Sequence, residues 1–146
     1  IDLLLQKKTF QEITSIAKNG PVYSIPGVTF MSALSDINGN VLHIIPGQGY
    51  KYYEKPEYVI LTNFSPFKGN REKHPWMGMD RYRTAEELLS KATGTFDVKE
   101  CFDILKACSQ VVCPTVVSMV FDVNEMKVYW CENRQWNKIE RREFFR

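Results

Sequence analysis

The polar side chains with the clearest capacity for chemistry follow an apolar run near the middle of the chain. Thr62 and Asn63 come directly after the apolar residues 58–61, and Pro66 follows them closely. A short apolar run that ends in turn residues predicts a strand buried on both faces. A rigid strand can hold the polar groups at its end, so the Asn63 amide is a candidate donor to a developing oxyanion. Asparagine after a strand is also a common turn residue, and local sequence leaves both roles open.

A second polar cluster carries two arginines. Arg81 and Arg83 alternate with Asp80 and Tyr82. An arginine can hold a carboxylate through charged hydrogen bonds, or lower the pKa of a neighbouring thiol. A solvated arginine near the start of a helix fits the same residues, so this cluster is a second candidate site with a structural alternative beside it.

The histidines and cysteines suggest no further catalytic or metal site. We expect His43 on the exposed face of a strand, while His74 lies in a charged loop before a proline, and no motif pairs either with a nucleophile. No C-x-x-C pair joins the four cysteines, so zinc is not predicted. We expect Cys101 and Cys108, seven residues apart on one face of a predicted helix, to be small core hydrophobes. Disulfides stay open for all four cysteines: Cys101, Cys108, Cys113 and Cys131. No phosphate-binding loop appears, so no cofactor is predicted.

The candidate site residues must be positioned by helices and strands, and the sequence predicts runs of helix that alternate with runs of strand. Capping boxes predict a helix from Thr9 to Lys18 and another from Asp97 to about Ser109. A third helix ends near Gly94 and begins at a cap on Thr84 or, one turn earlier, on Asp80. Strands are predicted at residues 28–34, 41–45 around an Asn-Gly turn, 50–53, 115–121, 127–131 and 136–144.

The fold class that follows is α+β with antiparallel sheets, because the strands and helices come in separate runs and the strands are joined by connections of hairpin length. Two packed sheets with helices outside satisfy the pattern, as do helices on one face only. A chain of 146 residues has the length of one domain. A net charge of +2 argues against a nucleic-acid partner, and no apolar run is long enough to predict a membrane span.

The order of the motifs resembles the C-terminal half of the linear amide C–N hydrolases. These N-terminal-nucleophile enzymes include choloylglycine hydrolase, penicillin V acylase and isopenicillin N acyltransferase. The first three matching stretches are a leucine-rich run leading into a Thr-x-x-Glu helix (residues 3–12), a hairpin (28–45) and an apolar strand that ends in Thr-Asn (59–63). An Arg-Tyr helix (78–89) and a closing hairpin (115–129) follow in the same order. The resemblance covers nearly the whole chain and implies a four-layer αββα sandwich.

The resemblance also implies roles for the candidate residues. In this family an N-terminal cysteine attacks a linear amide, and its own α-amino group serves as the base. Asn63 is similar to the asparagine of the oxyanion hole, and Arg81 to the arginine near the nucleophile. Phe64 stands where many members have histidine. Gly78 stands first in a Gly-Met-Asp-Arg sequence that replaces the family's Asp-Ser-x-x-Arg, which leaves Arg83 as a rival to Arg81.

The nucleophile itself is the largest departure, because the chain starts at Ile1 and not at cysteine. The resemblance therefore implies the C-terminal portion of an enzyme that acts on a small-molecule amide, inactive by itself. It also implies a partner that completes the sheet, either a missing N-terminal half or another chain, with a second copy as a further candidate. Two alternatives stay open: a non-catalytic binding or regulatory domain that keeps the fold, and an unrelated α+β interaction domain.

Overall fold

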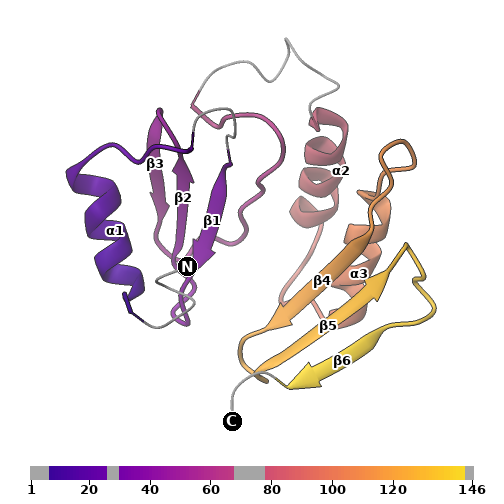
Figure 1. Cartoon of the computed structure of the whole chain (residues 1–146). Coiled ribbons are helices and arrows are strands. Elements are labelled where there is room, and N and C mark those ends of the chain that lie inside the picture. The colour runs from indigo at the N-terminus through magenta and orange to yellow at the C-terminus, as the bar shows by residue number, and fades with distance from the viewer. Residues whose placement is uncertain (1–6, 26–29, 68–77, 144–146) are drawn as a thin grey trace. The chain divides into compact units, whose positions relative to one another are not determined.

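The computed structural model describes residues 7–25, 30–67 and 78–143. They fall into two compact units, Ile1–His74 and Pro75–Arg146. Each unit combines helix with one three-stranded antiparallel sheet (Figure 1). The α+β class predicted from the sequence is confirmed. Among the described residues, no helix has the length and apolar character needed to cross a membrane.

The first unit opens with helix α1, Phe10–Asn19, whose start is set by its capping box. The Thr9 backbone N–H donates to Glu12 Oε2 at 2.7 Å, and the Glu12 N–H donates to Thr9 Oγ1 at 3.2 Å. These two bonds satisfy backbone donors that would otherwise lack partners at the helix N-terminus. The predicted helix is confirmed.

Sheet A follows, with strands β1 (Ser32–Ser35), β2 (Val41–Ile45) and β3 (Gly49–Tyr53) in the order β1-β2-β3. The predicted hairpin turn is present, because Asp36 Oδ1 accepts the backbone N–H groups of Asn38 and Asn40, each at 2.9 Å. The first strand is shorter than residues 28–34. It begins at Ser32, and positions 28 and 29 lie outside the described residues.

The core of the first unit lies on both faces of the central strand β2. Leu42 is fully buried and pairs with Tyr52, whose ring contacts the Phe10 ring of α1 at a centroid distance of 6.5 Å. Successive side chains of a strand point to opposite faces, so His43 and Ile45 face away from α1. Both are buried, which means that a second layer covers that face.

The second unit begins with helices α2 (Met79–Ser90) and α3 (Val98–Ala107). The two caps expected for α2 are wrong: Gly78 precedes the helix with a φ of 92°, and no side chain caps it. Thr84 lies within the helix, where its hydroxyl donates to the Asp80 carbonyl at 3.0 Å. Burial of Met79 explains why the helix starts earlier, since its first residue packs into the core.

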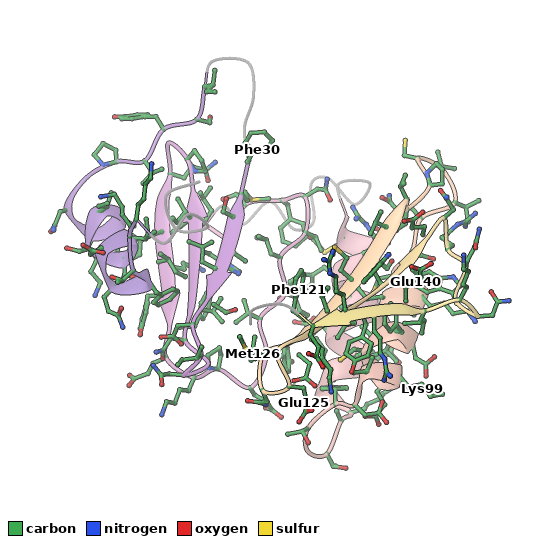
Figure 2. All side chains as sticks on the ribbon, turned by 60° about the horizontal axis from the view of Figure 1, so that its bottom comes forward. Phe30, Lys99, Phe121, Glu125, Met126 and Glu140 are labelled. Atoms are coloured by element: carbon green, nitrogen blue, oxygen red, sulfur yellow. The ribbon has the colours of Figure 1, made fainter. Side chains whose placement is uncertain are left out.

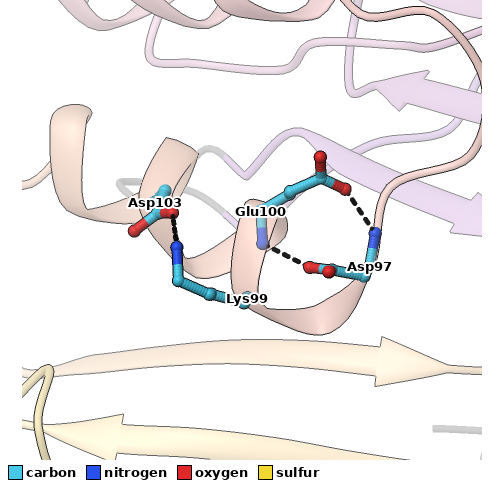
Figure 3. A network of polar contacts seen from close by, with 4 residues as sticks. All are labelled: Asp97, Lys99, Glu100 and Asp103. Carbon is cyan, nitrogen blue, oxygen red and sulfur yellow. Dashed lines mark hydrogen bonds and ion pairs between the residues drawn. The ribbon is translucent and has the colours of Figure 1, made fainter.

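The start of α3 agrees with the sequence. The Asp97 N–H donates to Glu100 Oε2 at 2.8 Å and the Glu100 N–H donates to Asp97 Oδ1 at 2.7 Å (Figure 3). On the exposed side of the helix, Lys99 and Asp103 form an ion pair with a 2.8 Å N–O distance. This capping box confirms the predicted N-terminus of the helix.

Sheet B closes the chain with β4 (Val117–Asp122), β5 (Lys127–Glu132) and β6 (Glu140–Glu143). The turn between β4 and β5 carries Glu125 and Met126, and Phe121 and Glu140 lie on the two outer strands (Figure 2). β6 is shorter than the extended segment 136–144, because residues 136–139 form turns and irregular backbone; residue 144 lies outside the described residues.

The two faces of sheet B differ in burial. Ser118 and Cys131, which pair across β4 and β5, are buried, as is Phe102 of the neighbouring α3. On the other face, three apolar residues of β4 are exposed at 47%, 46% and 59%: Val117, Met119 and Phe121. One face of sheet B therefore packs on helix and the other presents an apolar stripe to solvent.

Candidate functional site

The segment 58–67, which carries Asn63, is not a strand. In the described part of the chain its backbone pairs with no strand, and residues 58–62 are half-buried and irregular. Two residues explain the difference. Lys55 adopts a φ of 41°, and Pro56 follows it, so the chain turns away from β3 instead of continuing along the edge of the sheet. The prediction of a strand buried on both faces is wrong.

This segment is the layer that covers the second face of sheet A. Lys51 of β3 pairs directly with His43, so the two side chains share a face. The Lys51 ammonium donates to the Pro66 carbonyl at 3.2 Å and lies 5.3 Å from the centroid of the Phe67 ring. The Ser65 hydroxyl donates to Gln48 Oε1 in the β2–β3 turn. Side-chain anchors therefore hold the segment where a strand ladder does not.

Asn63 lies at a bend in this segment, between half-buried Thr62 and buried Phe64. Asn63 is itself exposed, so an external ligand can reach its side chain. Thr62 Oγ1 is buried and makes no hydrogen bond with any described residue. A buried hydroxyl that makes no hydrogen bond costs free energy, and such groups are uncommon in folded proteins.

Arg81 lies in the first turn of α2, half-buried, with its Nε atom buried. The Arg81 carbonyl accepts a hydrogen bond from the Cys108 thiol at 3.6 Å, which ties the start of α2 to the end of α3. Arg83, the rival candidate, is exposed on the same helix. Arg81 is thus the less exposed of the two arginines. Asn63 belongs to the first unit and Arg81 to the second.

His43 was expected on an exposed face, and that expectation is wrong. The side chain is 2% exposed, and its Nδ1 atom makes no hydrogen bond with a described residue. Its ring meets the Tyr53 ring edge-on, with centroids 5.2 Å apart and planes at 72°. Burial lowers the pKa of His43 below its ordinary value, and the positive charge of Lys51 lowers it further. Strand alternation could not reveal this, because the segment that covers His43 lies twenty residues away.

The four cysteines differ in burial, and three of them have thiols with raised pKa values. All four are free, so no disulfide joins them. Burial raises the pKa of three thiols: Cys101, Cys108 and Cys131. Thiols with raised pKa values are protonated at neutral pH and are poor nucleophiles. Cys101 and Cys108, which were expected in the core, are half-buried, whereas Cys131 is buried and Cys113 is exposed.

No metal site is visible in the described ranges, which hold no group of three or more histidine, cysteine or acidic side chains that could bind an ion. His74 lies outside these ranges.

Comparison with protein-family models, with characterised proteins and with solved structures finds no match for the chain.

Proposed function

We propose that this chain forms the C-terminal part of an enzyme that hydrolyses, or transfers the acyl group of, linear amides. In this proposal an N-terminal cysteine outside the chain attacks the amide carbonyl, and its α-amino group accepts the thiol proton and passes it to the departing amine. Water, or an acyl acceptor, then releases the acyl group from the sulfur. Asn63 donates a hydrogen bond to the oxyanion, and Arg81 lies near the thiolate.

The observation that carries this proposal is the exposed apolar stripe of sheet B. Helix packs against one face of the sheet, while Val117, Met119 and Phe121 remain exposed on the other. An apolar face of a sheet is stabilised when another layer packs against it. A second sheet packed on that face would produce the helix–sheet–sheet–helix order that the sequence resemblance implies.

The state of the thiols supports a nucleophile located elsewhere. Cys101, Cys108 and Cys131 have raised pKa values because they are buried, so none is prepared for attack. Asn63, in contrast, is exposed on a segment that is anchored just after it, through Ser65 and Pro66, as a donor to an external substrate must be.

The proposal is tested with Asn63→Ala in the protein that joins this chain to its N-terminal cysteine segment, assayed on a panel of N-acyl amides. Loss of an oxyanion donor should lower kcat by about 10²–10³ with little change in KM. Asn137→Ala is the matched control, because Asn137 is also exposed but lies in a turn of the second unit. Its kcat should equal that of the wild type.

Two outcomes would contradict the proposal. If Asn63→Ala keeps its full kcat while its circular dichroism remains native, Asn63 is not an oxyanion donor. If the 146-residue chain alone hydrolyses these amides, the nucleophile does not lie outside it.

A non-catalytic binding domain is the second candidate, favoured by the raised pKa values of three buried or half-buried thiols, Cys101, Cys108 and Cys131. It predicts saturable binding of a ligand with no turnover, even when the N-terminal cysteine segment is present.

A further inference from the structure

A groove of about 390 Å³ runs along one side of α1 in the first unit. The helix contributes one wall, and β3 and the β1–β2 turn form the other, on the side of sheet A where α1 lies beside β3 (Figure 1). The volume falls within the range of about 300–1,000 Å³ typical of small-molecule sites. The groove does not include Asn63 or any other residue of the segment 58–67.

Both walls of the groove are held in place without a ligand. The Phe10 and Tyr52 rings meet across it at 6.5 Å. In the turn, the Asp36 carboxylate accepts three hydrogen bonds, from the N–H groups of Asn38 and Asn40 and from Asn40 Nδ2, each at 2.9 Å. Burial raises the pKa of Asp36, but these bonds outweigh that effect and keep it below its ordinary value. A preformed site loses less entropy when a ligand binds.

The charged side chains Asp36 and Lys18, which both line the groove, differ in how many partners surround them. Asp36 is surrounded by its three donors, so it has little capacity left for a ligand. Lys18 has no carboxylate within ion-pair distance among the described residues, and its ammonium lies 5.5 Å from the centroid of the Tyr52 ring. Three ammonium protons are therefore available beside an aromatic surface that is 40% exposed.

We propose that this groove binds a small organic monocarboxylate with a compact apolar body. Its carboxylate accepts hydrogen bonds from Lys18, and its apolar body packs against Phe10 and Tyr52. Lys18 is the one cation among the described lining residues, and the Asp36 carboxylate nearby is already held by its own three donors, so a singly charged anion is favoured over a phosphate dianion. Neutral amides on both walls, including Gln11 and Asn38, complete a polar rim.

The test compares phenylacetate with phenylacetamide, a neutral compound of nearly the same shape. Each is titrated into the ¹⁵N-labelled 146-residue chain, and amide shifts are followed by NMR. Phenylacetate should bind with a Kd roughly in the millimolar range, as expected for so small a ligand, and shift amides of α1, the β1–β2 turn and β3. Phenylacetamide should bind about fivefold more weakly, because a partly exposed charge pair contributes modestly.

Three variants make the result specific. Lys18→Met should raise the Kd for phenylacetate about fivefold and abolish the preference over phenylacetamide. Lys18→Arg keeps the cation and should retain the preference. Lys106→Met removes an exposed lysine from α3 and should change nothing.

Each contrary result overturns the proposal. Absence of saturable shifts in the wild type shows that the groove binds no such ligand. Equal affinity for the two compounds, or equal effects of Lys18→Met and Lys106→Met, shows that Lys18 does not recognise a carboxylate. Dispersed NMR spectra of each variant establish that it is folded.

Discussion

Replacing His43 should change how the stability of the first unit depends on pH. His43 is 2% exposed, and both burial and Lys51 hold its pKa below the ordinary value of 6.5. Above about pH 6.5 the imidazole is neutral in both the folded and the unfolded protein and contributes no pH dependence. Below that pH the unfolded chain binds a proton that the folded protein does not, so the free energy of unfolding falls as the pH falls.

The magnitude follows from the proton count. One proton bound only by the unfolded state lowers the free energy of unfolding by at most about 1.4 kcal/mol per pH unit. This slope applies from the unfolded pKa down to the folded pKa. Three carboxyls with lowered pKa values, Glu12, Asp36 and Glu87, add a slope of the same sign, but it sets in near their unfolded values of 4.5, 3.8 and 4.5, below the range of the His43 slope.

The informative variant is His43→Phe, which keeps an aromatic ring beside Tyr53 and removes the titrating group. Urea denaturation between about pH 5 and about pH 7.5 should show the slope in the wild type and its loss in His43→Phe. His74→Gln is the matched control, since it removes the chain's other histidine and should keep the slope due to His43. An unchanged slope in a folded His43→Phe protein would refute the assignment of His43 as a buried neutral imidazole.

Two further predictions concern the scaffold, both measured as the free energy of unfolding in denaturant. Leu42→Ala should cost about 2–5 kcal/mol, because Leu42 is fully buried in the central strand of sheet A, whereas Leu88→Ala on the exposed side of α2 should cost much less; equal costs would contradict this view of the core. Asp97→Ala should cost about 1 kcal/mol by removing the cap of α3, and Asp103→Ala at most about 0.5 kcal/mol by breaking its exposed pair with Lys99; a reversed order would contradict the capping role.

The features that sequence predicts correctly are those determined by neighbours in the chain. The capping boxes at Thr9 and Asp97 join residues three positions apart, so their helices begin where the sequence indicates. The turn at Asp36 is also local, since its hydrogen bonds reach no further than Asn40. The start of α2 depends instead on the packing of Met79, and local signals at Thr84 misplace it.

For the candidate sites, too, the sequence predicts what depends on neighbouring residues and misses what depends on tertiary packing. The sequence identifies Asn63 and Arg81 by type and motif order, and their catalytic roles remain proposals. The groove beside α1 was not foreseen, because its walls come from elements separated by more than a dozen residues. One signal was available: Gln11, Ser15 and Lys18 put polar side chains at helical spacing on a single side of α1.

The two errors in the first unit have a single cause. The sequence predicts a strand for the apolar run before Asn63 and an exposed position for His43. Instead, the chain leaves the sheet at Lys55, and the segment that follows covers the face on which His43 lies. Asn63 is therefore positioned by side-chain contacts and not by a hydrogen-bonded ladder. The contacts of Lys51 with Pro66 and the ring of Phe67 hold the segment that presents Asn63 on the face of sheet A where His43 lies. The stability of this face of sheet A and the placement of Asn63 accordingly depend on the same few contacts.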